Sequence, residues 1–168
     1  MIISVRRYRP EDLDAVIDIF LRAIRDTASA DYNPDQIAAW ARADRDLWAT
    51  RRLSHPTWIA EVSGRPAGFT DLEDDGHLDM MYVHPDFGGC GVATQLVRTA
   101  EHHATSRGIR TIYSEVSLTA RRFFERMGFV VVEPENVFRN GQWFTRFKME
   151  KLLSDRTSLS DGTEQGSA

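Results

Sequence analysis

The chain has 168 residues, of which 42% are hydrophobic and 27% charged, and its formal net charge is −4. This length suits one domain with a buried core, and the composition lacks the basic excess of nucleic-acid-binding proteins. One cysteine excludes an intramolecular disulfide and a CxxC zinc site. Because the N-terminus reaches charge too early for a signal peptide and no apolar run approaches a membrane span, we expect a cytoplasmic protein without a membrane partner.

The first third of the chain predicts one strand and two helical regions. Residues 2–10 alternate as a strand that stops at Pro10, and a helix begins near Glu11. Its apolar side chains recur at the three- and four-residue spacing of one helix face: Leu13, Val16, Ile17, Phe20, Leu21 and Ile24. A second helical region opens at Pro34 and is expected to break near residues 43–46.

The rest of the chain alternates strands with helices. Strands are predicted at residues 57–62, 66–73, 77–84, 111–116, 129–134 and 143–152. One helix runs to about Ser106 and is closed by Gly108, and a shorter one over 118–127 is closed by Gly128. This order predicts a mixed α/β domain over residues 1–153, while the polar residues 154–168 are expected to form a disordered tail.

The segment "HPDFGGCGVATQL", residues 84–96, places glycines directly before a predicted helix. It is either a plain turn or a backbone cradle for a phosphate, because the first N–H groups of a helix are unpaired and the helix dipole favours an anion. A Walker loop is excluded, since no lysine occurs before Lys148. A dinucleotide fingerprint fits poorly, because Thr94 stands where its third glycine belongs. A coenzyme A pyrophosphate is the third alternative.

Two motifs in order, "MYVHPDFGGCGVATQL" and "SLTARRFFERMGF", resemble the GNAT superfamily of N-acetyltransferases, and the resemblance covers roughly residues 2–153. It implies a GNAT-like acyl-CoA N-acyltransferase fold, with a mixed central sheet of about six to seven strands flanked by helices. It also implies transfer of an acetyl group from acetyl-CoA to a primary amine, on a small molecule or a protein, by direct attack in a ternary complex. The alternative is a GNAT-fold module that binds acyl-CoA with weak or no turnover.

The resemblance implies two sets of backbone contacts with acetyl-CoA. N–H groups of the glycine loop and the following helix would hold the pyrophosphate: Gly89, Cys90, Gly91, Val92, Ala93 and Thr94. Free backbone groups of Met81, Tyr82 and Val83 would hold the pantetheine arm and polarise the thioester. Gly88 replaces the glutamine or arginine of the family, so a side-chain contact is lost, and Arg98, Arg121 or Arg122 are the available substitutes.

The remaining positions concern proton transfer and the pantetheine. Many members use a tyrosine to protonate the leaving thiolate, but this chain has Phe124 there. Either another group serves, with Tyr113 and Tyr82 as candidate phenols, or water serves, or the transfer is slow. Asp79 is the first candidate for the base that deprotonates the amine. Glu73 and Glu115 are second candidates. Ser117 stands at a position where the family contacts pantetheine, or it caps the short helix.

Aromatic residues are dense in the first 60 positions: Tyr32, Trp40, Trp48 and Trp58. They either wall an acceptor pocket, pack in the core, or form an exposed surface for a homodimer. Because the five histidines lack ligand-like spacing, we expect no metal.

Overall fold

Seven strands lie in two hydrogen-bonded sheets, one in the order β1-β2-β3-β4 and one in the order β5-β7-β6. The computed structural model describes residues 2–154, so the predicted tail lies almost wholly outside the described residues. The strands are β1 (Ile3–Arg7), β2 (Thr57–Val62), β3 (Arg65–Asp71), β4 (Met81–Val83), β5 (Thr111–Ser117), β6 (Val130–Arg139) and β7 (Gln142–Leu152). All neighbouring strands within each sheet are antiparallel. The α/β class is as predicted, but the expected single sheet is divided.

The five α-helices begin and end close to the predicted positions. They are α1 (Leu13–Asp26), α2 (Pro34–Trp40), α3 (Arg45–Ser54), α4 (Val92–Ser106) and α5 (Arg121–Arg126). The Asn33 side chain accepts a hydrogen bond from the N–H of Gln36 at the start of α2, and Asp44 does the same for Leu47 in α3. These caps explain why the predicted second helical region forms two helices. None of the described helices is long and apolar enough to cross a membrane.

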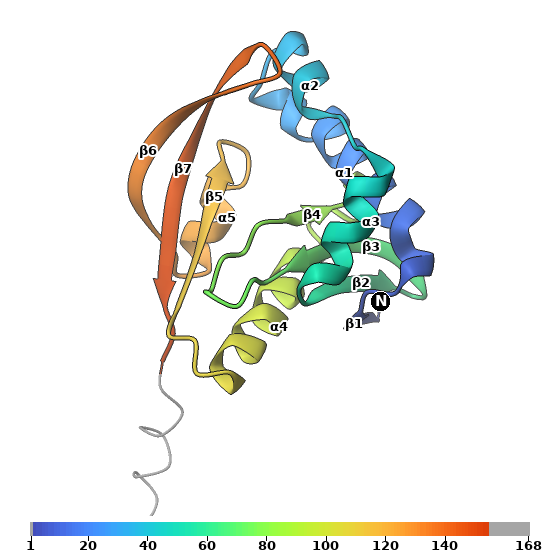
Figure 1. Cartoon of the computed structure of the whole chain (residues 1–168), viewed down its shortest axis with the longest axis vertical. Coiled ribbons are helices and arrows are strands. Elements are labelled where there is room, and N and C mark those ends of the chain that lie inside the picture. The colour runs from blue at the N-terminus through green and yellow to red at the C-terminus, as the bar shows by residue number, and fades with distance from the viewer. Residues whose placement is uncertain (1, 155–168) are drawn as a thin grey trace, which may run out of the picture.

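The four-stranded sheet has helices on both faces (Figure 1). On one face Phe20 of α1 and Trp48 of α3 pack against Phe69 of β3. On the other face α4 lies against the sheet, and Gly68 of β3 permits this contact. A Cβ at that position would meet Val92 Cγ1 at 2.9 Å, so a larger residue would push α4 off the sheet.

The three-stranded sheet reaches back over the first one. Its β6–β7 hairpin turns at Asn140-Gly141, where both residues have the positive φ of a two-residue turn. The tip of the hairpin meets α2 (Figure 1), since the Asn140 side chain donates to the Ala39 carbonyl at 2.8 Å and the Gln36 side chain donates to the Trp143 carbonyl at 2.8 Å. Thus α2 and the hairpin together cover the space between the sheets.

Backbone hydrogen bonds join β5 to the segment before β4, among the described residues. Leu78 N–H donates to the Tyr113 carbonyl at 2.9 Å, and Tyr113 N–H donates to the Gly76 carbonyl at 3.1 Å. The predicted strand at residues 77–84 is shorter than expected, because β4 begins at Met81 and the residues before it belong to an irregular segment. From there β4 and β5 separate, and this separation positions the site.

Candidate active site

A cavity of about 700 Å³ lies where β4 and β5 separate. Among the residues predicted for the site, Asp79, Met81, Tyr82, Glu115, Ser117 and Phe124 line it. Tyr113, Val83 and the glycine loop do not. Aromatic rings from α1, the loop before α2, α2, α3 and β7 complete the wall: Phe20, Tyr32, Trp40, Trp48 and Phe144. The shape suits a small molecule held between the two sheets.

The open edge of β4 presents backbone donors on the side of β5. In the β3–β4 ladder, Asp71 N–H donates to the Met80 carbonyl and His84 N–H donates to the Ala67 carbonyl. Since bonding alternates along an antiparallel strand, the backbone groups of Tyr82 face β3, while the N–H groups of Met81 and Val83 face away from it. Neither of these two N–H groups has an acceptor among the described residues. Tyr82 was predicted to offer free backbone groups as well, and its place in the ladder excludes this.

The glycine loop forms a row of unpaired donors at the start of α4. Gly89 and Gly91 have φ of 75° and 89°, values that favour glycine, and Gly91 immediately precedes the helix. Within residues 2–154, the backbone N–H groups of positions 89–94 have no acceptor. The Cys90 thiol lies 3.7 Å from the Gly88 carbonyl. Successive free N–H groups at a helix N-terminus can hold a phosphate.

Two predicted contacts on the β5 side have local roles. The Ser117 hydroxyl accepts a hydrogen bond from Ala120 N–H at 3.2 Å, so it stabilises the turn before α5 and keeps its own proton available. Phe124 is buried against Phe129, with the ring centroids 5.0 Å apart, and its ring contributes an apolar surface to the cavity. Of the arginines proposed to replace the family's loop side chain, Arg121 lies over Phe147 and pairs with Glu125.

A histidine that the sequence analysis set aside joins the predicted carboxylates. His77 Nε2 lies 2.6 Å from Glu115 Oε2, and His77 Nδ1 lies 3.4 Å from Glu73 Oε1. The hydrogen bond to Glu115 raises the pKa of His77 to about 9, and the same bond lowers the pKa of Glu115. The pair is therefore charged at neutral pH. Asp79 is the third member of this cluster.

The same three side chains are the group that could hold a metal ion within the described part of the chain. One ligand atom from each of His77, Asp79 and Glu115 lies within 4.8 Å of the others. A nitrogen and carboxylate oxygens suit several divalent metals. Because the pKa of His77 is about 9, a proton competes with any metal at neutral pH.

The charged pair predicts a pH-dependent difference in stability. The raised pKa of His77 contributes stability that is complete below its ordinary value of 6.5 and is lost as the pH rises through about 9. We therefore expect His77→Gln to lower the free energy of unfolding by about 1–2 kcal/mol at pH 6.5 and by much less at pH 9.5. Urea titrations at the two pH values measure this. The control His103→Gln removes an imidazole whose pKa burial lowers, so the same loss in that variant would contradict the assignment.

The two candidate phenols are in different environments. The Tyr113 hydroxyl donates to Asp75, and this bond raises the pKa of Tyr113 to about 12. Burial raises the pKa of Tyr82 to about 12, and the neighbouring Trp40 side chain partly offsets this rise.

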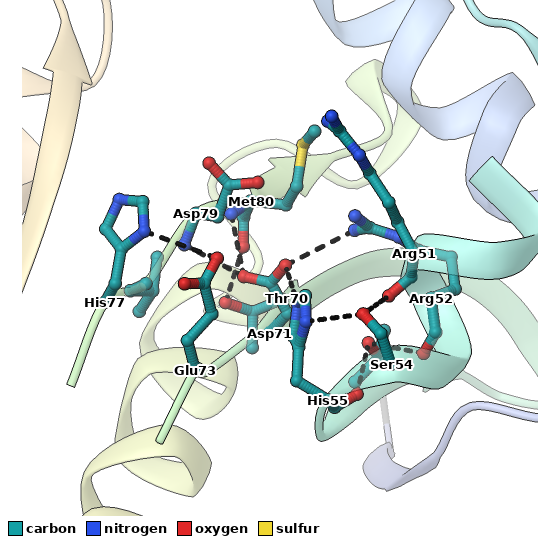
Figure 2. A network of polar contacts seen from close by, with 12 residues as sticks. Arg51, Arg52, Ser54, His55, Thr70, Asp71, Glu73, His77, Asp79 and Met80 are labelled. Atoms are coloured by element: carbon teal, nitrogen blue, oxygen red, sulfur yellow. Dashed lines mark hydrogen bonds and ion pairs between the residues drawn. The ribbon is translucent and has the colours of Figure 1, made fainter. Parts of the chain in front are cut away.

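A buried carboxylate fixes the segment that carries Asp79 (Figure 2). One oxygen of Asp71 accepts the N–H groups of Asp79 and Met80 at 2.9 and 2.8 Å. Its other oxygen lies 2.8 Å from His55 Nε2 and 3.4 Å from an Arg52 nitrogen. Asp71 is 0% and Arg52 2% exposed, and the bond to Asp71 raises the pKa of His55.

The aromatic cluster predicted near the N-terminus is divided between cavity and core. Tyr32 is buried, and its hydroxyl donates to the Thr145 carbonyl and accepts from Leu118 N–H, at 2.9 and 3.0 Å. Trp40 and Trp48 also line the cavity, whereas Trp58 packs on His103 away from it. None of these rings is exposed, so they form no surface patch, and the homodimer stays a prediction.

Sequence reasoning missed His77 and the buried residues that surround Asp71. The partners come from separate parts of the chain: Glu115 is 38 positions from His77, and Asp71 is 16 from His55 and 19 from Arg52. No spacing motif links them. The available signal was an aspartate at the end of an otherwise apolar strand, since a carboxylate in such a position must find partners when it is buried.

Comparison with known proteins identifies the family. A family profile described as "Acetyltransferase (GNAT) domain" matches residues 28–151. The chain is 36% identical over 147 residues to the uncharacterized N-acetyltransferase YafP of Escherichia coli strain K12, covering 88% of this chain and 94% of that protein. It is 30% identical over 135 residues to the peptidyl-lysine N-acetyltransferase YjaB of the same strain, covering 78% and 84%.

A solved structure gives the same result. The crystal structure of a GCN5-related N-acetyltransferase from Rhodopseudomonas palustris superposes with a TM-score of 0.86 at 36% identity, covering 91% of this chain and 99% of that one. This chain therefore combines the separated β4 and β5 strands and the glycine loop before α4 with a sequence that matches the family profile. The protein belongs to the GNAT family of acetyl-CoA-dependent N-acetyltransferases.

Proposed function

We propose that the cavity between β4 and β5 transfers an acetyl group from acetyl-CoA to a primary amine by direct attack in a ternary complex. One observation carries this proposal: the unpaired N–H of Met81 lies on the edge that borders the cavity, beside Asp79 and Glu115. A donor at this edge can stabilise the negative charge that develops on the thioester oxygen. The free N–H groups of positions 89–94 would bind the pyrophosphate.

The side chains supply the two proton movements that the reaction requires. Asp79 accepts a proton from the incoming ammonium, and the charged pair of His77 and Glu115 lies beside it. The neutral amine then attacks the thioester carbonyl, the carbon–sulfur bond breaks to leave a thiolate, and the attacking nitrogen releases its second proton to solvent as the amide forms. Tyr82 donates its proton to that thiolate and regains one from solvent, since its hydroxyl is protonated at neutral pH and the residue lines the cavity.

For the acceptor, the proposal specifies a primary amine and no particular molecule. YjaB, the relative that is 30% identical, is named a peptidyl-lysine N-acetyltransferase, so both a lysine side chain and a small amine fit. A module that binds acyl-CoA without turnover is the alternative, and Phe124 in place of a tyrosine favours it. The position of Tyr82 in the cavity wall supports turnover.

Two measurements test the proposed function. Calorimetry with acetyl-CoA, coenzyme A, NAD and ATP should show binding of the first two only. Release of free thiol in the presence of a panel of primary amines should then exceed the rate without amine. Binding of acetyl-CoA with no amine-dependent release would identify a binding module, and binding of NAD or ATP in place of coenzyme A would refute the assignment of the loop.

Restoring a side chain at Gly88 should strengthen binding of the co-substrate. Gly88 has φ of −61° and ψ of 139°, and a Cβ there would lie 3.5 Å from its nearest neighbour, the Pro85 carbonyl oxygen. Gly88→Arg is therefore sterically permitted, and we expect the Kd for acetyl-CoA to fall by about three- to tenfold because the guanidinium would pair with phosphate. Calorimetry at low and high salt measures this. Gly88→Ala controls for the backbone; an equal effect of both variants would show that no phosphate lies near this position.

A further inference from the structure

Three arginine side chains in the cavity wall make no ion pair with any residue in the described part of the chain. They are Arg42, Arg51 and Arg139. A fourth, Arg146, is neutralised because it pairs with Glu135. Arg42 donates its Nε to the Ala38 carbonyl at 3.2 Å, which leaves its terminal nitrogens free. The cavity therefore presents uncompensated guanidinium groups.

The acidic side chains of the cavity offset these charges only in part. Glu115 is paired with His77, and Asp44 accepts Leu47 N–H at 3.1 Å as the cap of α3 but has no cationic partner. Within residues 2–154, three arginines of the lining without an ion pair therefore face two such carboxylates, Asp44 and Asp79. The chain as a whole has a net charge of −4, so the positive cavity is a local feature and not a consequence of composition. Such a cavity attracts anionic ligands.

The positive groups line the same cavity as the carboxylate assigned to the amine. In the view of Figure 2, the Arg51 and Asp79 side chains are seen on either side of Met80. The charge of Asp79 raises the pKa of the Tyr82 hydroxyl, and the charge of Arg139 lowers it. A bound molecule can therefore place a cationic amine at Asp79 while an anionic group reaches an arginine.

The wall between these charged groups is aromatic. Trp40 packs against Tyr82 and Phe144, with ring centroids 6.5 and 6.3 Å apart, and all three border the cavity. Such rings favour a flat or apolar body. We infer that the acceptor is a small primary amine that also carries a carboxylate or phosphate on an apolar body, an inference that rests on the proposed acetyl transfer. A lysine in a polypeptide lacks the second charge.

A matched pair of amines tests this inference. 4-(Aminomethyl)benzoate and benzylamine share one skeleton and differ only in the carboxylate, and 4-(aminomethyl)phenylphosphonate carries phosphonate in its place. With saturating acetyl-CoA, we expect kcat/KM for the carboxylate compound to exceed that for benzylamine by about tenfold or more. Arg51→Gln and Arg139→Gln should each raise KM for the carboxylate about tenfold and change KM for benzylamine little. Arg107→Gln removes an arginine that does not line the cavity and should leave both unchanged.

The outcomes separate this inference from the proposed function. Equal kcat/KM for the two amines, equal effects of the arginine variants on both, or a lysine peptide that exceeds both would overturn the anionic acceptor and leave acetyl transfer intact. If no amine is acetylated, the proposed function fails, and calorimetry with the coenzyme A-saturated protein decides the inference alone. Binding of 4-(aminomethyl)benzoate that Arg51→Gln weakens would support it; no binding would refute it.

Discussion

Tyr82→Phe should lower kcat about 100-fold while leaving the Kd for acetyl-CoA within about twofold of the wild type. The substitution removes the phenolic proton that we assign to the leaving thiolate, and general acids of this kind typically contribute roughly 10²–10⁴-fold. The ring would keep its packing against Phe20 and Phe69, with centroids 5.0 and 5.8 Å away. Steady-state thiol release and calorimetry on the same preparation measure the two quantities.

Tyr113→Phe provides the discriminating comparison. Its hydroxyl is bound to Asp75, and the residue does not line the cavity, so we expect kcat within about threefold of the wild type. The opposite pattern, a large loss in Tyr113→Phe and none in Tyr82→Phe, would assign the proton donor to β5. It would also mean that the bond between Tyr113 and Asp75 breaks when the substrates bind. Equal small losses would indicate that water protonates the thiolate.

The elements most completely predicted from sequence were those whose signals are local. Pro34 in the first turn of α2, Gly108 after α4 and Gly128 after α5 each meet a local backbone requirement of a helix end. The division into two sheets was not predictable in this way, because it depends on where β4 loses its pairing with β5. The predicted strand 77–84 is largely apolar, but Leu78 N–H bonds to Tyr113 of β5, and the N–H groups of Asp79 and Met80 bond to the Asp71 side chain and not to a strand.

The candidate site was predicted only in part, because local sequence signals identify single residues and not their contacts with distant ones. The carboxylates Asp79 and Glu115 could be singled out one at a time, each as a charged residue in an apolar stretch, and both line the cavity. Their relation to His77 could not, since that contact joins segments on either side of α4. The arginines without an ion pair could not be predicted either, because the sequence shows that an arginine is charged and not whether a carboxylate lies beside it.

Asp71→Ala should combine a large loss of stability with a loss of activity. Arg52 and His55 would lose the carboxylate that neutralises them, and Arg52 is buried, lies over the Trp48 ring and already has an unpaired Nε. Removing one partner of a buried ion pair typically costs about 3–5 kcal/mol. The N–H groups of Asp79 and Met80 would also lose their acceptor, so Asp79 would no longer be held at the cavity. Urea unfolding and thiol release measure both effects.

Asp71→Asn separates charge from position. The amide oxygen can still accept the N–H groups of Asp79 and Met80, but the negative charge beside Arg52 is gone. We expect most of the stability loss of the alanine variant, with kcat within about tenfold of the wild type and KM for acetyl-CoA unchanged. Adding Arg52→Met should restore part of the stability, because the two changes act on one buried pair. A kcat for Asp71→Asn as low as that for Asp71→Ala would mean that the charge of Asp71, and not its hold on the Asp79 segment, is what the reaction requires.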